Sequence, residues 1–113
     1  MKEILSSKIH KATVTEANLE YVGSITIDKT LMDLVELIEG QKVLVVSNTT
    51  GNRLETYVIP GENDSGVICM NGASAHLIKK GEEIIIMGFE ITDKPIKAKN
   101  ILVDKNNRFL KFL

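Results

Sequence analysis

The sequence is poor in several residue types, and each shortage narrows what the protein can be. Cysteine occurs once among 113 residues, so the chain forms no internal disulfide, which suits a reducing compartment. Tryptophan is absent and aromatic residues make up only 4%, so Ile, Leu and Val must fill the core, a composition that favours β structure. No stretch approaches the roughly 20 apolar residues that cross a bilayer. We therefore expect a β-rich cytoplasmic protein.

An excess of charge of one sign is also lacking. Basic and acidic side chains number 14 and 15, which gives a formal net charge of -1. This balance supplies no overall field to attract nucleic acid or an anionic membrane, so we expect neither partner. The two histidines, His10 and His76, are far apart in sequence and lack clustered cysteines or carboxylates, so no metal site is predicted. Cys69 is expected to be a buried small hydrophobic residue rather than a nucleophile.

A chain of this length fits one domain, residues 1–113. Its pattern predicts many short strands, at residues 8–15, 21–28, 41–48, 53–60, 67–70, 82–92, 101–104 and 108–113. One helix is predicted after Asp28, a suitable N-cap, because apolar residues recur at helical spacing through Ile38 until Gly40. The loop 71–81 can open into a helical turn. Short strands with one or two short helices favour a small closed barrel.

Strict alternation along a strand predicts which side chains share a face. The segment 24–28 should be a half-buried strand in which Ile25 and Ile27 face the core. The first strand should place on one face Lys8, His10, Ala12 and Val14. The strand 53–60 should place Arg53, Glu55 and Tyr57 on one face and Thr56 on the other.

The pair Gly23-Ser24 is by itself typical of a turn or a strand bulge. Its neighbours carry more information. The segments SSKIH (6–10), YVGSITID (21–28), RLETY (53–57) and NGASAH (71–76) resemble the aspartate 1-decarboxylase family, in the same order and at similar spacing. The resemblance extends from about Lys8 to Phe89.

This resemblance implies a mainly β fold, a small six-stranded double-psi β-barrel with one or two short helices. It also implies a carbon-carbon lyase that decarboxylates L-aspartate to β-alanine and carbon dioxide, for pantothenate and coenzyme A synthesis. Family members are homotetramers with sites between subunits, and we expect the same of this chain.

The resemblance further implies that the chain cuts itself at Gly23-Ser24. The Ser24 hydroxyl would attack the Gly23 carbonyl, and the single domain 1–113 would become a β chain, 1–23, and an α chain, 24–113. Ser24 would become a pyruvoyl group, which forms the Schiff base with substrate and takes the place of pyridoxal phosphate. Gly23 suits the attack because it lacks a Cβ, and Thr56 would donate a hydrogen bond to the oxyanion that forms.

The remaining roles also follow from the matched positions. Lys8 and Arg53 would bind the two carboxylates of aspartate, and Tyr57 would be the proton donor after carbon dioxide leaves. The other residues expected at the substrate are Thr56, Asn71, Gly72 and Ala73, and those expected to support the site are His10 and Tyr21. Two departures from the family pattern are Val46, where many members have tryptophan, and Ser74, where the pattern has alanine.

One conflict stays open in this interpretation. Alternation puts Thr56 and Tyr57 on opposite faces, although the family uses both near one centre, so either the strand is bulged or the site lies between subunits. The family's tetrameric assembly favours the second. The competing hypothesis is a non-catalytic double-psi barrel that binds a peptide, nucleotide or partner domain. A swapped-hairpin DNA-binding protein would need a basic stripe, which the charge balance does not supply.

Overall fold

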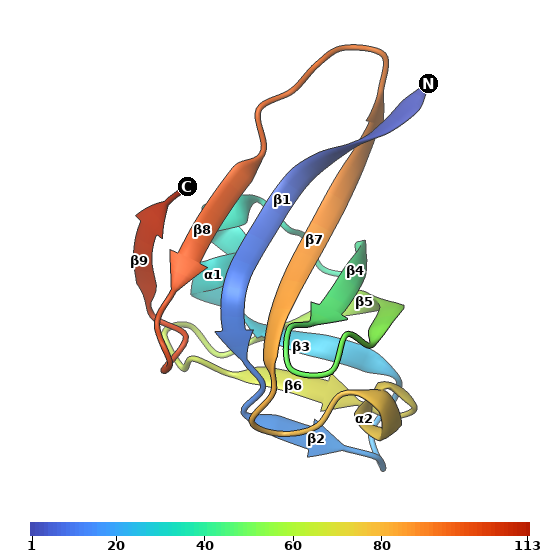
Figure 1. Cartoon of the computed structure of the whole chain (residues 1–113), viewed down its shortest axis with the longest axis vertical. Helices are drawn as coiled ribbons and strands as arrows, with labels where there is room; N and C mark the ends of the chain where they lie inside the picture. Colours follow the sequence, from blue (N-terminus) through green and yellow to red (C-terminus); the bar gives the residue numbers. More distant parts are fainter.

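Nine strands form one continuous hydrogen-bonded sheet in the computed structural model, which describes residues 1–113 (Figure 1). Their order across the sheet is β2-β6-β3-β5-β4-β7-β1-β8-β9. The strands are β1 (Lys2–Thr13), β2 (Glu16–Asn18), β3 (Ser24–Asp28), β4 (Lys42–Ser47), β5 (Arg53–Gly61), β6 (Ile68–Asn71), β7 (Glu83–Thr92), β8 (Lys99–Val103) and β9 (Phe109–Phe112). Two short helices, α1 (Lys29–Val35) and α2 (Ser74–Leu77), complete the fold, and neither has the length and apolar character needed to span a membrane.

The sheet closes on itself because β1 and β2 are almost one strand. Only two residues, Val14 and Thr15, separate them, and the Val14 N–H donates to the Glu82 carbonyl beside β7. The next N–H, of Thr15, donates to the Ile68 carbonyl on β6. One stretch of chain thus joins β7 at one end and β6 at the other, which completes a six-stranded barrel with β3, β5 and β4. The predicted mainly β barrel with one or two short helices is confirmed.

The barrel interior is filled by aliphatic side chains, as the shortage of aromatic residues predicted. A cluster of 19 buried residues consists of Ile, Leu, Val, Met and Ala, and draws on every barrel strand except β2. Full burial of one such large side chain is worth about 1.5–3 kcal/mol relative to exposure, so this cluster supplies most of the driving force for closure. The strand β3 is central to it, since Ile25 and Ile27 are completely buried.

Both ends of the opposite face of β3 are also buried and only Thr26 between them is half-buried, so the prediction of a half-buried strand was wrong. Ser24 and Asp28 are 0% and 1% exposed. The reason is tertiary, because the N–H groups of Asp64 and Gly66, in the turn before β6, donate to the Asp28 carboxylate, and the Asn71 side chain contacts Ser24. Alternation along a single strand cannot reveal such cover.

The predicted face of the first strand is correct only as far as His10. Lys8 and His10 are both half-buried and alternate with the buried Ile9, but Ala12 is buried on the same side as Ile9. A β-bulge causes this change, because β1 has one residue more than β7 between the pairs Ile9–Ile86 and Ala12–Ile84. Lys11 takes a left-handed backbone conformation there, with φ 65°. A single inserted residue moves every later side chain to the other face, including Val14.

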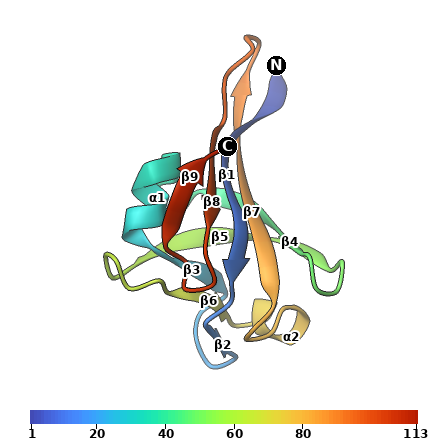
Figure 2. The same cartoon turned by 60° about the vertical axis from the view of Figure 1, so that its left-hand side comes forward.

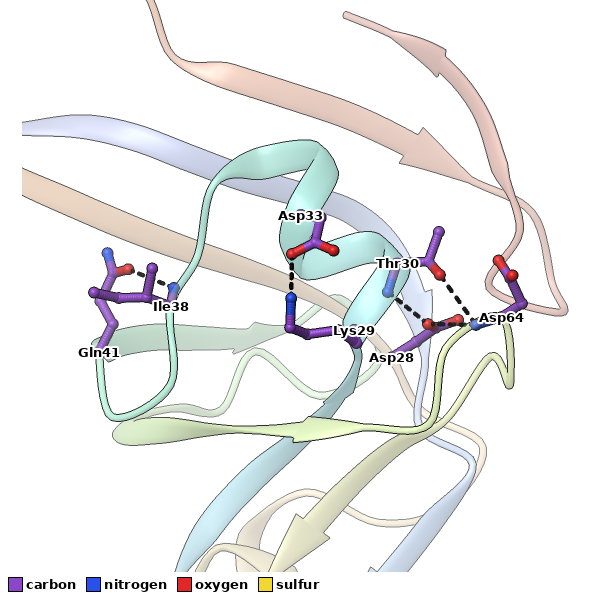
Figure 3. Close-up of polar contacts among 7 residues, drawn as sticks. All are labelled: Asp28, Lys29, Thr30, Asp33, Ile38, Gln41 and Asp64. Atoms are coloured by element: carbon purple, nitrogen blue, oxygen red, sulfur yellow. Dashed lines mark hydrogen bonds and ion pairs between the residues drawn. The ribbon is translucent and has the colours of Figure 1, made fainter.

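The helix α1 begins where the sequence predicted and ends earlier. The Asp28 carboxylate caps it by accepting from the Thr30 N–H, and the same carboxylate accepts from the Asp64 N–H (Figure 3). The helix ends at Val35 because Glu36 takes a left-handed conformation with φ 61°. Ile38, placed in the helix by spacing alone, is therefore outside it and 70% exposed.

Two segments of strand were not predicted. β1 begins at Lys2, and this early part forms with β7 a long two-stranded arm that projects from the barrel (Figures 1 and 2). The three-residue strand β2 lies in a polar stretch that has no apolar alternation. Its formation depends on pairing with β6, which is a tertiary contact that local sequence does not encode.

Candidate functional site

The pair Gly23-Ser24 lies at the beginning of β3, in the middle of the barrel wall. Ser24 is the first residue of the strand and pairs with Asn71 on the antiparallel β6. On the other side, Ile25 pairs with Val58 of the parallel β5, so Ser24 and Tyr57, which directly precede them, occupy neighbouring positions. Three of the four sequence motifs thus meet at the start of one strand.

The Ser24 side chain is fully buried and held by two hydrogen bonds. Its Oγ donates to the Val22 carbonyl at 3.0 Å and accepts from Asn71 Nδ2 at 2.9 Å. Gly23, one residue earlier, is exposed to solvent. The buried Ser24 hydroxyl therefore lies next to the Gly23-Ser24 peptide bond, and the residue on the other side of that bond, Gly23, is exposed to solvent.

Gly23 has no steric need to be glycine in this conformation. Its φ is outside the left-handed region, and a Cβ built on it would meet no atom within 4 Å. The close approach is made instead by Gly72, whose φ is +64°. A Cβ on Gly72 would lie 2.8 Å from both the N and the Cα of Gly23, and 2.9 Å from the Tyr21 carbonyl oxygen. The absence of a side chain at Gly72 is what allows the segment 21–23 to pass.

Thr56 and Tyr57 lie on β5 and line a shallow hollow of about 310 Å³ together with Lys42 and Glu55. Tyr57 is 39% exposed and Thr56 is half-buried. Lys42 and Glu55 form an ion pair at 3.0 Å across β4 and β5, which raises the pKa of Lys42 through the hydrogen bond to that carboxylate. The Thr56 hydroxyl makes no hydrogen bond to the Gly23 carbonyl, and the side-chain donor that reaches Ser24 is Asn71 Nδ2.

The two cations expected at the substrate are not brought together within one chain. Arg53 begins β5 and is exposed, whereas Lys8 lies on β1, and β4 and β7 separate these strands in the sheet. His10 is on the same face of β1 as Lys8, and its Nδ1 is buried without a hydrogen-bond partner. Burial lowers the pKa of His10, the positive charges of Lys8 and Lys11 lower it further, and Glu83 acts in the opposite direction.

The alternation conflict on β5 is resolved in one respect. β5 pairs with β4 from Arg53 to Tyr57 in an unbroken register, so the strand contains no bulge there. Arg53, Glu55 and Tyr57 are exposed on one face, and Thr56 lies on the other with the buried Val58. The sequence-based assignment of these faces is confirmed, and one of the two explanations for the conflict is excluded.

The remaining expected residues border the cleavage segment. Tyr21 is about half exposed in the loop before β3 and contributes its carbonyl to the contact with Gly72. Ala73 is exposed and precedes α2, and the Gly72 carbonyl accepts from the Ala75 N–H at 3.0 Å. The two departures from the family pattern lie elsewhere: Ser74 is the first residue of α2, and Val46 is half-buried on β4.

Two residues at this position were missed from the sequence. Thr26 Oγ1 accepts a second hydrogen bond from Asn71 Nδ2, at 2.9 Å, and the Cys69 thiol donates to Asn71 Oδ1, at 3.1 Å. Cys69 is buried as predicted, but it acts as a hydrogen-bond donor and not only as a hydrophobic residue. Alternation in β3 and β6 could have placed both beside Ser24 and Asn71, because each is two residues away on the same face.

Fold and site together define a small β-barrel protein with a fully buried serine hydroxyl at the first residue of an inner strand, next to a solvent-exposed glycine. The chain belongs to the aspartate decarboxylase family, which matches residues 1–110.

Two relatives agree with this membership. The aspartate 1-decarboxylase of Acetivibrio thermocellus is 52% identical over 111 residues, which cover 95% of this chain and 88% of the relative. Another, from Clostridium botulinum (strain Alaska E43), is 53% identical over 108 residues, with 92% and 87% coverage. A solved structure of a designed double-psi barrel, msDPBB_sym2, is similar with a TM-score of 0.47 and 17% identity, over 77% of this chain and 99% of that one.

Proposed function

We propose that the chain is a self-processing aspartate decarboxylase, in which Ser24 is converted to a pyruvoyl group by cleavage of the Gly23-Ser24 bond. The observation that carries this proposal is the buried Ser24 hydroxyl, fixed by Asn71 beside the exposed Gly23. Family membership supports the decarboxylation of L-aspartate. A binding module would gain nothing from a nucleophile held in this way.

Self-cleavage uses groups that the chain itself supplies. The Ser24 Oγ attacks the Gly23 carbonyl carbon, the C–O bond forms as the C–N bond breaks, and the hydroxyl proton passes to the freed nitrogen. The ester then undergoes elimination: Cα of residue 24 loses a proton, and the Cβ–Oγ bond breaks with its electron pair leaving in the Gly23 carboxylate. Water hydrolyses the resulting dehydroalanine and releases ammonia, which leaves the keto group.

The surroundings of Ser24 suit a keto acid at that position. The keto oxygen that hydrolysis leaves on Cα takes the position of the former amide nitrogen, while Cβ becomes a methyl group and Oγ departs with Gly23, so the Asn71 amide beside Cβ lies close to the new group. The new carboxylate end at Gly23 is formed at the solvent-exposed side, so no charge needs to be buried. A pyruvoyl group supplies an electrophilic ketone that takes the amine of aspartate and withdraws electrons as carbon dioxide leaves.

The chain's own side chains would bind substrate and move the proton. Arg53 can grip a carboxylate through two parallel hydrogen bonds, and Lys8 supplies the second positive charge. Because Lys8 and Arg53 are on separated strands and Tyr57 faces away from Thr56, a complete site needs residues from two chains. We therefore propose sites between subunits, in a homotetramer as the family resemblance implies. Tyr57, beside Ser24 on the parallel strand, would protonate the carbanion.

In the cell, the product β-alanine would feed pantothenate and coenzyme A synthesis, and the protein would be cytoplasmic. His10 and Tyr21 would support the site, and Ala73 would contact the substrate through its backbone N–H. The Gly72 N–H donates to the Asn18 carbonyl at 2.8 Å, so Gly72 would border the substrate without donating to it. These assignments rest on the matched positions and on the proximity of Tyr21 and Gly72 to the cleavage bond.

The test is intact mass under denaturing conditions, combined with carbon dioxide release from aspartate. We expect two fragments, 1–23 and 24–113, the larger one resistant to Edman degradation because it begins with a keto acid. Ser24→Ala should remain one chain and release no carbon dioxide. The matched control is Ser65→Ala, an exposed serine in the turn before β6, which should be cut as fast as the wild type. A wild-type chain that stays uncut and inactive on prolonged incubation contradicts the proposal.

A further inference from the structure

Four polar side chains form a square on the outer face of the β3–β6 ladder. Ser24 pairs with Asn71, and Thr26 pairs with Cys69, in alternate positions of the same antiparallel register. The residues between them, Ile25 and Met70, are completely buried on the other face, in the core. Asn71 is the only member of the square that bonds to the other three.

All the contacts of Asn71 agree on one orientation of its amide. Nδ2 donates to two hydroxyl oxygens, Ser24 Oγ and Thr26 Oγ1, each at 2.9 Å. Oδ1 accepts a single hydrogen bond, from the Cys69 thiol at 3.1 Å. The Thr26 hydroxyl can serve as donor or acceptor and fits either orientation of the amide, whereas Ser24 gives its proton to the Val22 carbonyl and therefore accepts from Asn71. The thiol fixes the orientation from the opposite side of the amide, and it can be changed without altering Ser24 itself.

The thiol keeps its proton in this environment. Cys69 is 6% exposed, and burial raises the pKa of the thiol, with the Glu16 carboxylate acting in the same direction. A protonated sulfur is a hydrogen-bond donor, and the Asn71 oxygen at 3.1 Å is its nearest acceptor. With an amide rotated by 180°, the thiol would face an NH₂ group, two donors would oppose each other, and Oδ1 would point to Ser24.

The orientation of the amide matters for the bond that breaks at Ser24. During elimination, Oγ leaves with the electron pair of the Cβ–Oγ bond, so negative charge grows on it. An N–H at 2.9 Å stabilises that charge, whereas a carbonyl oxygen in the same place would repel it. We propose that Cys69 is a positioning residue for self-cleavage, whose thiol holds the Asn71 amide with its N–H directed at Ser24 Oγ. This inference rests on the self-cleavage proposed above.

Thr26 has a different part in the square. Its hydroxyl takes the second Asn71 N–H, which satisfies the amide without choosing its orientation. Removing the Thr26 hydroxyl should therefore slow cleavage less than removing the donor at Cys69.

The test compares two matched substitutions at Cys69. Cys69→Thr and Cys69→Val have nearly the same shape and suit a strand, but only threonine retains a donor. Freshly synthesised full-length chain is followed by intact mass, and the melting temperature of each variant is measured on a Ser24→Ala background, where no cutting interferes. We expect the valine variant to be cut about tenfold more slowly than the threonine variant, the value of one neutral hydrogen bond. Cys69→Ser and Cys69→Ala repeat the comparison with smaller side chains, in case the branched ones do not fold.

A double-mutant cycle with Asn71→Ala separates positioning from general destabilisation. Once the amide is gone, Cys69→Val should add no further slowing. Equal cutting rates for threonine and valine, or full additivity in the Asn71→Ala background, would overturn the role of Cys69 while leaving self-cleavage established. A wild-type chain that is never cut would instead remove the proposed function itself.

Discussion

Substitution of Gly72 by alanine should block or greatly slow self-cleavage without unfolding the barrel. The added Cβ would lie 2.8 Å from the N and Cα of Gly23, whereas ordinary contact begins at 3.4 Å, so the two backbones must separate by about 0.6 Å. Both partners are backbone atoms and cannot rotate away. The φ of +64° costs alanine a further ~1 kcal/mol. Because a misplacement of about 1 Å at a reacting centre can reduce a rate by a factor on the order of 100, we expect cleavage to slow by at least about tenfold.

The assay follows the uncut chain by intact mass after synthesis, with melting temperature as the measure of folding. The matched control is Gly81→Ala, which carries a similar backbone penalty at φ +90° but places its Cβ in open space. Gly81 lies between α2 and β7, away from the cleavage segment. The reasoning is refuted if the Gly72 variant is cut as fast as the Gly81 variant at equal melting temperature.

Three other substitutions test separate parts of the site. Tyr57→Phe should leave cleavage intact and lower kcat by a factor of about 100 or more, and unchanged turnover per cut chain would remove its role as proton donor. Arg53→Lys should raise KM for aspartate by about tenfold while affecting kcat less, because lysine cannot form two parallel hydrogen bonds with a carboxylate. Arg108→Lys is the control. Equal effects of the two substitutions on KM would argue against specific binding of a substrate carboxylate by Arg53. His10, whose pKa is lowered by burial and by Lys8 and Lys11, favours the neutral form when folded. The contribution of neutral His10 to folding stability is present above its ordinary pKa of about 6.5 and is lost as the pH falls through the pKa in the folded protein. The melting temperatures of wild type and His10→Gln should therefore diverge on acidification. Melting temperatures that fall in parallel would contradict the lowered pKa.

The sequence predicted the elements that depend on local patterns. The hairpin of β4 and β5, the strand β7 and the cap at Asp28 follow from alternation and from a carboxylate before a helix, both of which are short-range signals. The end of α1 and the bulge at Lys11 were missed because each depends on one non-glycine residue in a left-handed conformation. Such a residue is held there by packing elsewhere in the fold, which no local pattern reports.

In the candidate site, too, the sequence predicted what local motifs determine and missed what depends on tertiary contacts. The family motifs pointed to Ser24, Asn71 and Gly72. We expected the steric requirement for glycine at Gly23, but it lies at Gly72, because the backbone of Gly72 approaches the backbone of Gly23 closely. Cys69 was predicted to be buried, and alternation along β6 places it on the same face as Asn71, but the position of both residues beside Ser24 and Thr26 required knowing that β6 pairs with β3. The separation of Lys8 from Arg53 likewise appears only in the order of the strands.

The closure of the barrel through β1 has a further consequence for a chain cut after Gly23. The fragment 1–23 contains β1 and β2, which pair with β7, β8 and β6 of the other fragment. A cut barrel is therefore a two-chain complex held by three strand interfaces, and on dilution it separates only as fast as those interfaces open. Once it unfolds, however, the two fragments must find each other again, and refolding becomes second order in protein concentration. Cleavage would convert a barrel that refolds unaided into one that persists chiefly through slow unfolding.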